Sequence, residues 1–429
     1  MANSEHLALI KQGVEVWNAW YKNHKRVVPD LAQANLSNFN LRGINLTNAN
    51  LKQANLNHVD LSQSQLVNAD LHQANLLGAN LNDANLKGAN LDFVIFSQAI
   101  INRQTIIATK YLKVSEIVNH KVANKDFSGI DLSNSNLFRA DLSNAQLSNT
   151  KLINVNFNSA NLNGAYLYKA DLTGANLQNA DLRNAYFSQA DLTSVNLHHA
   201  LCCGTYFKEA DLKFANFKAA QFSHKTMIDF KWYSVWEIVN RGAAKKNLSG
   251  VDLSNANLQG ANFESANLTN AKLSHAILRH SNLHAANLTN TDLVGANVYG
   301  VDLNQANLKG AKLKSLKCDR HTQLSTINKR HQTRQTSTNV AVQEKPLDET
   351  KIIPKSPAPT KLQTAQSIVP NQAQVKTKSG KNFLGIFWLV IMAAMMAGGY
   401  VFLNQNPDFP WAEKLQQWKQ KLEQLIPAG

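Results

Sequence analysis

The chain has 429 residues and a formal net charge of +15, with 44 Lys and Arg residues against 29 Asp and Glu residues. Its three cysteines, two of them adjacent, are too few for a disulfide framework and favour a reducing compartment. The sequence has no GxSxG, Walker, GxGxxG or HExxH motif, so we expect a protein that is not an enzyme and has no catalytic, cofactor-binding or metal site.

Residues 1–28 are predicted to form an N-terminal cap. Between residues 4 and 22, apolar side chains recur at helical spacing, which indicates an amphipathic helix. They are Leu7, Ile10, Val14, Trp17 and Tyr21. We expect this helix to cover one open end of the core that follows, because an uncovered end would aggregate.

A period of five residues dominates the chain from residue 29 onward, in three blocks that span 29–101, 127–222 and 248–318. Of fifty repeat centres, 38 are Leu and eight are Phe. The other four are Ile101, Cys202, Val298 and Cys318. Most centres follow a small residue by two positions, usually Ala, and the remaining positions are polar.

Neither a helix nor a strand repeats every five residues, so the pattern predicts a third geometry. A chain that turns a corner every five residues points one large and one small side chain inward, while its backbone pairs with the coils above and below. Such a solenoid buries a thin continuous core that no single coil could bury alone.

Tandem A(N/D)LXX units, such as Ala79-Asn80-Leu81 and Ala170-Asp171-Leu172, resemble the pentapeptide-repeat family. The resemblance implies an all-β solenoid, a right-handed four-sided β-helix with four repeats per coil. The segments HLALIKQGVEVWNAW (6–20) and VWEIVN (235–240) are similar to those of cyanobacterial members.

A four-sided coil predicts that residues twenty apart share a column, and like residues do gather at that spacing in the second block. One column holds Tyr166, Tyr186 and Tyr206. Another holds Asp131, Lys151, Asp171, Asp191 and Asp211, with Arg183 and Lys213 nearby to offset its charge. The tyrosines either stack to stabilise the coils, the preferred interpretation, or dock a partner; the aspartates either are solvated or face a cation or basic partner.

Two inserts, 102–126 and 223–247, separate the blocks and are copies of each other. TIIATKYLKVSEIVN begins at Thr105 and aligns without gaps to TMIDFKWYSVWEIVN, which begins at Thr226. Both place apolar residues at positions typical of a short helix. We therefore expect three modules of helix plus β-helix, with each helix closing a core end; the pattern leaves open whether the coils stack as one rod.

Residues 319–382 are rich in Thr, Gln, Ser, Lys and Pro, which is typical of a disordered linker. Residues 383–403 carry no charge over 21 positions and predict a single membrane-spanning helix. Lys376, Lys378 and Lys381 precede this span, so the repeats are expected on the cytoplasmic side. They serve as topology markers or as contacts to anionic lipid.

The tail, residues 404–429, has an apolar stripe that suits either a membrane surface or a partner. Small residues at Ala394 and Gly398 within the predicted span would permit self-association, so a homo-oligomer is possible. HHALCC (198–203) has residue types that bind metals, but the four-sided coil would spread them over different sides, and we interpret them as variable surface positions.

The function predicted from these features is a non-enzymatic, membrane-tethered scaffold that presents a rigid β-helix to an unknown protein partner. Solenoids commonly work through such extended surfaces. Two alternatives are disfavoured. A DNA mimic that protects topoisomerases, known within the family that the repeats resemble, would be strongly acidic, whereas residues 31–318 hold 26 basic and 19 acidic residues. A nucleic-acid-binding protein would cluster its basic residues, and here they are scattered.

Overall fold

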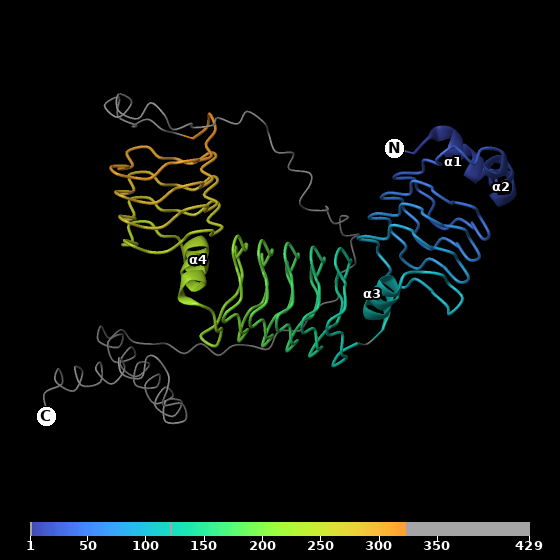
Figure 1. The fold of residues 1–429 in the computed structure, drawn as a ribbon, viewed down its shortest axis with the longest axis horizontal. Coiled ribbons are helices and arrows are strands. Elements are labelled where there is room, and N and C mark those ends of the chain that lie inside the picture. Colours follow the sequence, from blue (N-terminus) through green and yellow to red (C-terminus); the bar gives the residue numbers. More distant parts are fainter. Residues whose placement is uncertain (1, 121, 323–429) are drawn as a thin grey trace, which may run out of the picture. The chain divides into compact units, whose positions relative to one another are not determined.

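The computed structural model describes residues 2–120 and 122–322 of the chain (Figure 1). It contains four helices in this part: α1 (Ser4–Lys11), α2 (Val14–Asn23), α3 (Thr109–Asn119) and α4 (Phe230–Arg241). None of these helices is long and apolar enough to cross a membrane. The predicted span 383–403, the tail 404–429 and almost all of the predicted linker lie outside the described residues, so the fold concerns the cap, the three blocks and the inserts.

Between the helices, the backbone pairs as isolated parallel bridges, and no extended strand is present among the described residues. The bridges join residues twenty apart, as in the series Asn35, Asn55 and Asn75, except for one bridge of 21 residues at the end of each of the first two blocks. The Leu36 N–H donates to the Asn55 carbonyl at 2.8 Å in the same way. The predicted coil of twenty residues is therefore confirmed, but each of its sides pairs through a single bridge residue between two turns.

One repeat shows why the period is five. Leu162 is fully buried, and the Ala165 N–H donates to its carbonyl at 3.0 Å, which closes a tight turn. The Asn161 side chain accepts from the Asn163 N–H at 3.1 Å. Gly164 then takes a left-handed conformation with φ near 67°. Asn and Asp recur before the centres because their short side chains hold the turn that follows.

The three blocks form three separate ladders. The last bridge of the first block joins Asn85 to Ile106, and the next ladder starts at Asp126. Within the described residues no bridge crosses from one block to the next. Backbone contact across each boundary is a single hydrogen bond, from the Phe93 N–H to the Asn134 carbonyl and from the Phe214 N–H to the Asn255 carbonyl, both 2.8 Å.

The predicted N-terminal helix is wrong in one respect, because it is two helices rather than one. The chain breaks at Gly13, whose φ of 112° is incompatible with a continuous helix. Helix α2 still covers the first coil, and the buried Trp17 indole N–H donates to the Asn45 carbonyl at 2.7 Å. The cap prediction is otherwise confirmed, although Val14 and Leu7 are only partly buried.

Both insert helices are confirmed, and each closes the end of the block before it. Asn119 at the end of α3 donates to the Phe96 carbonyl at 3.0 Å, and Asn240 near the end of α4 donates to the Phe217 carbonyl at 3.0 Å. In Figure 1 these two helices lie where the blue-green and the green coils end.

Candidate interaction surface

The tyrosine column forms an aromatic ladder on the second block, which we define as Tyr166, Tyr186 and Tyr206. The ring centroids of the first pair lie 4.8 Å apart with an interplanar angle of 1°, and those of the second pair lie 4.5 Å apart at 12°. The backbones of the three residues are joined by parallel bridges. The spacing predicted from the sequence is therefore confirmed, and the rings do stack.

Stacking leaves part of each ring available to solvent. Tyr166 is 40% exposed, and the other two rings are intermediate. Desolvation raises the pKa of Tyr186, with a further contribution from Tyr206, so the phenol stays neutral over the physiological range. The ladder is thus a partly exposed aromatic surface held rigidly by the coils.

The column continues for one residue beyond the three tyrosines predicted from the sequence. Met227 pairs with Tyr206 and is 55% exposed, so it extends the ladder by one step. It lies 21 residues after Tyr206 because the last coil contains one extra residue. The Thr226 hydroxyl closes that longer coil by donating to the Cys202 carbonyl at 2.7 Å. The matching Thr in both inserts was the signal that could have revealed this shift.

The aspartate column is present, with bridges from Lys151 through Asp171 and Asp191 to Asp211. Each of the last three carboxylates accepts a hydrogen bond from the backbone N–H two residues later. Lys213 pairs with Asp211 at 2.7 Å, as expected. Arg183 does not offset this column, because it pairs with Asp181 at 2.6 Å. The carboxylates therefore hold turns, with Lys213 paired to Asp211 at one end of the run and Lys151 bridged to Asp171 at the other.

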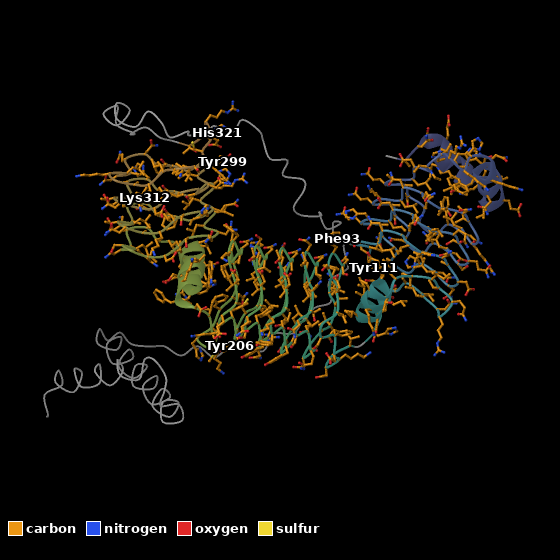
Figure 2. All side chains as sticks on the ribbon, viewed as in Figure 1. Phe93, Tyr111, Tyr206, Tyr299, Lys312 and His321 are labelled. Carbon is orange, nitrogen blue, oxygen red and sulfur yellow. The ribbon has the colours of Figure 1, made fainter. Side chains whose placement is uncertain are left out.

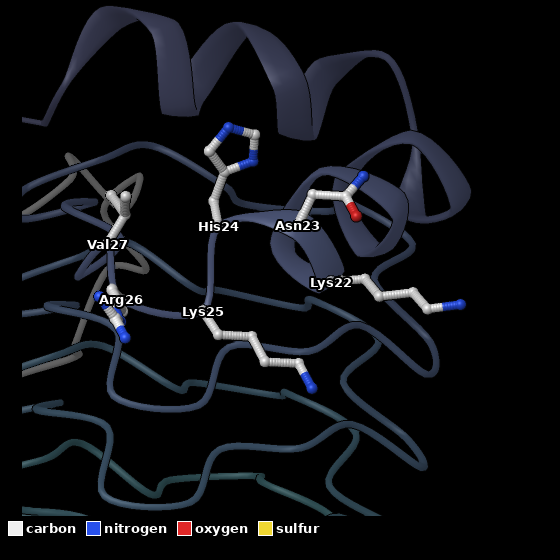
Figure 3. Close-up of a pocket in the computed structure, with 6 residues that line it drawn as sticks. All are labelled: Lys22, Asn23, His24, Lys25, Arg26 and Val27. Carbon is white, nitrogen blue, oxygen red and sulfur yellow. The ribbon is translucent and has the colours of Figure 1, made fainter.

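The other candidate features of the described residues are the buried cysteine, the possible metal ligands and a hollow beside α2. Cys202 is fully buried at a core centre, and burial raises the pKa of its thiol far above its ordinary value. Among the described residues, no group of three or more His, Cys, Asp or Glu side chains could hold a metal ion. An open hollow at the end of α2 is lined by residues 22–27, and Figure 3 shows Lys22, His24 and Lys25 among the side chains that line it.

Three further predicted residues, Lys376, Lys378 and Lys381, lie outside the described part of the chain. Figure 2 shows Tyr206 of the ladder toward one edge of the second block. The described candidate with a defined, exposed and rigid geometry is the aromatic ladder with Met227.

Comparison with known proteins identifies the repeats. The family model described as Pentapeptide repeats matches residues 30–63, 64–103, 124–152, 150–189, 190–224, 247–284 and 281–315, more than half of the chain. None of the curated proteins compared with the chain matches it.

Solved structures that match are also pentapeptide-repeat proteins. HetL, involved in heterocyst differentiation regulation in the cyanobacterium Nostoc, is 24% identical; the match covers 67% of this chain and 89% of HetL, with a TM-score of 0.14. A protein of the Arabidopsis thaliana thylakoid lumen is 36% identical over 27% of this chain and 77% of its own, with a TM-score of 0.17.

QnrB1, a plasmid-mediated fluoroquinolone resistance protein, is 14% identical over 59% of this chain and 87% of its own, with a TM-score of 0.19. These low TM-scores carry no argument about function. The family model, the twenty-residue coils and the buried Leu and Ala columns agree, and the chain belongs to the pentapeptide-repeat family.

Proposed function

We propose that this protein is a non-enzymatic scaffold that binds a protein partner through the aromatic ladder. The observation that supports this proposal is a row of three stacked tyrosines, extended by Met227. These side chains stay partly exposed on one side of the second block. Aromatic and methionine side chains are enriched at the centres of protein interfaces. Because the coils already fix the rings, a partner would gain contact area with little loss of side-chain entropy.

The surroundings of the ladder favour a protein over a nucleic acid. Tyr168 lies beside the ladder, and its hydroxyl donates to Gln189 at 3.2 Å. Gln189 in turn donates to Glu209 at 3.0 Å, so the neighbouring column ends in a carboxylate. A polar rim of mixed charge around an apolar strip is typical of protein interfaces. A DNA-mimic function would require a strongly acidic wall, and this rim holds Lys169 and Lys208 as well.

The test is a pull-down from solubilised membranes with the full chain. We expect the Tyr166→Ala/Tyr186→Ala/Tyr206→Ala variant to lose a protein that the native chain retains. The matched control is Tyr→Phe at all three positions, which keeps the stacked rings and should retain that protein. Hydrogen exchange across the second block checks that the coils persist. An unchanged set of retained proteins in the alanine variant would remove this surface from the proposal.

We further propose that residues 383–403 tether the scaffold to a membrane and that the right-handed repeat domain lies on the cytoplasmic side. The support is the run of 21 uncharged residues preceded by Lys376, Lys378 and Lys381. Deleting 383–403 should move the protein from the membrane pellet to the supernatant after alkaline extraction. Retention of the deletion variant in the pellet would contradict the tether.

A further inference from the structure

The end of the third block carries the same closing turn as the other two. Thr105, Thr226 and Thr322 each donate their hydroxyl to a core carbonyl 24 residues earlier, at 2.8, 2.7 and 2.9 Å. This shared turn aligns the three block ends residue by residue. In the first two ends a helix follows the turn and covers the last coil.

Those two helices close their ends with one hydrogen-bonding device, which we call the asparagine clip. Asn240 of α4 donates to the Phe217 carbonyl at 3.0 Å, and its side-chain oxygen accepts from the Ala219 N–H at 2.6 Å. Asn119 of α3 makes the same pair of contacts with Phe96 and Gln98, at 3.0 and 2.5 Å. The device thus satisfies one carbonyl and one N–H on the coil edge.

The third block offers the same receptor groups without the clip. Counted back from Thr322, the matching residues are Leu313, which supplies the carbonyl, and Ser315, which supplies the N–H. Within the described residues the Ser315 N–H has no acceptor, and the Leu313 carbonyl accepts only from the N–H of Leu316 in its own turn. These are edge groups that a helix with a carboxamide would satisfy.

The core is also less covered at this end. At two centres of the last coil the exposed fraction is 2% and 1% in the first block, for Leu91 and Phe96, and 0% and 1% in the second block, for Leu212 and Phe217. The next centre does not follow this trend, since Ile101 and Phe222 are partly buried and Cys318 is 6% exposed. Their counterparts in the third block, Leu308 and Leu313, are only partly buried. Within the described residues, the end of the third block therefore presents apolar surface at Leu308 and Leu313, where the other two ends are closed at the matching centres.

A basic rim surrounds this open end. Lys309, Lys312, Lys314, Lys317 and Arg320 are all exposed, and none is paired with an acidic residue of the described chain. The one acidic residue among them, Asp319, uses its carboxylate to hold the closing turn through Gly300 and Thr322. Figure 2 shows Lys312 extending outward from the third block.

We propose that this open end is a receptor for an α-helix of a partner protein. The occupant has an apolar face that covers Leu308 and Leu313, a carboxamide at its C-terminal end for Leu313 and Ser315, and acidic residues along its flanks. The acidic flanks follow from the five unpaired cations, because complementary charge steers binding. A second copy is disfavoured, since two such ends would face each other with like charge.

The sequence directly after Thr322 lacks the asparagine of the clip. Aligned on the threonine, the segment TQLSTINKRHQTRQT has Thr336 where the inserts have Asn119 and Asn240. It is also basic, with Lys329, Arg330 and Arg334, so it would add to the repulsion. The charge pattern thus favours an acidic helix from another chain.

The test uses a labelled peptide of residues 226–242, which contains α4. A staple between positions 233 and 237, on its outer face, holds the peptide helical. We expect saturable one-to-one binding to the full-length chain. A second peptide with Lys231→Glu and Arg241→Glu should bind at least tenfold more tightly at low salt, and an Asn240→Ala peptide at least tenfold more weakly. Absence of saturable binding by the acidic peptide overturns the proposal.

Two protein variants test whether the peptide binds at the open end of the third block. Leu313→Asp should abolish binding, while Leu112→Asp, an exposed leucine on α3, should leave it unchanged. Lys312→Glu/Lys314→Glu involves only exposed side chains and should remove the preference for the acidic peptide. If neither the Leu313 variant nor the Lys312/Lys314 variant changes peptide binding, the proposal that the end of the third block is the receptor is wrong.

A photo-crosslinking residue at position 315 of the full-length chain tests the occupant directly. Crosslinks to the acidic peptide support the proposal, whereas crosslinks to residues 323–429 or to a second copy, formed with the peptide present, overturn it. The alanine variant of the aromatic ladder should bind the peptide normally, so failure of this proposal and failure of the proposed function are distinguishable.

Discussion

The α3 and α4 junctions are two copies of one insert, and comparing them separates what the fold requires from what it tolerates. Both have the threonine turn, the asparagine clip and one backbone hydrogen bond to the next block. The packing differs. In the α4 junction, Trp236 stacks on Phe222 with ring centroids 4.8 Å apart; the matching residues of the α3 junction are Ser115 and Ile101.

Because both junctions have the same hydrogen bonds to the coil edge, we infer that these bonds set the positions of α3 and α4. The aromatic packing is present at α4 alone and adds to the stability of that junction. The Trp236 indole N–H also donates to the Ala220 carbonyl at 2.8 Å, a contact that Ser115 cannot make. Ser115 instead accepts from Asn119 at 3.1 Å and so orients the clip. The α4 junction should therefore be the more stable of the two.

The largest effect is expected at this tryptophan. Trp236→Ala removes a side chain that is only 7% exposed, and should cost the α4 junction about 3 to 5 kcal/mol. Hydrogen exchange of the amides between residues 214 and 222 measures the loss locally. Ser115→Ala is the matched control and should cost about 1 kcal/mol or less. Equal losses at the two junctions would show that aromatic packing does not distinguish them.

Removal of the clip should have the next largest effect, and a similar one at both junctions. Asn119→Ala and Asn240→Ala each leave a coil-edge N–H without a partner and remove one of the two hydrogen bonds that the Phe96 or Phe217 carbonyl accepts, at a cost of about 2 to 3 kcal/mol. Faster exchange of the Gln98 and Ala219 amides reports the loss directly. A clearly smaller effect in one variant would mean that the two helices are held by different means.

A third contrast lies in Tyr111, whose hydroxyl donates to Asp92 at 2.9 Å in the α3 junction. Tyr111→Phe should cost about 1 to 2 kcal/mol, because it removes a hydrogen bond to a charged acceptor. Thermal unfolding together with exchange near residue 92 measures it. The control is Tyr233→Phe on the outer face of α4, which should leave the free energy of unfolding unchanged. An equal loss of stability in the two variants would argue against the hydrogen bond.

The coils could be predicted from the sequence because the repeat centres recur every five residues and the columns every twenty. Tyr166, Tyr186 and Tyr206 stack as their spacing predicts. The period of twenty alone misses that Met227 continues the ladder, since one extra residue in the coil shifts the register and only the threonine shared by the two inserts marks that shift. The sequence pattern also did not show whether α3 and α4 cover the block before them or the block after them, because an apolar helix face can pack against either one. The shared EIVN of both inserts carried that information in Asn119 and Asn240.

Electrostatics should give the smallest contrast between the two junctions. Glu116 of α3 pairs with Lys113 and Lys125, both at 2.9 Å, whereas Glu237 of α4 pairs with Lys246 at 3.3 Å. Hydrogen bonds from Lys113 and then Lys125 hold the pKa of Glu116 below its ordinary value of 4.5. Because these side chains are largely solvated, Glu116→Gln should cost only about 0.5 kcal/mol at neutral pH.

The sign of the pH dependence follows from that lowered pKa. The carboxylate of Glu116 stabilises the folded chain above the pKa of the unfolded state, and this contribution disappears as pH falls through the lower folded pKa. The difference between the native chain and Glu116→Gln should therefore be constant from neutral pH to about 5 and vanish on further acidification. Glu237→Gln, with its single longer ion pair, should show a smaller difference throughout. A Glu116→Gln effect that persisted below pH 3 would have to come from packing, and the contrast between the junctions would then not be electrostatic.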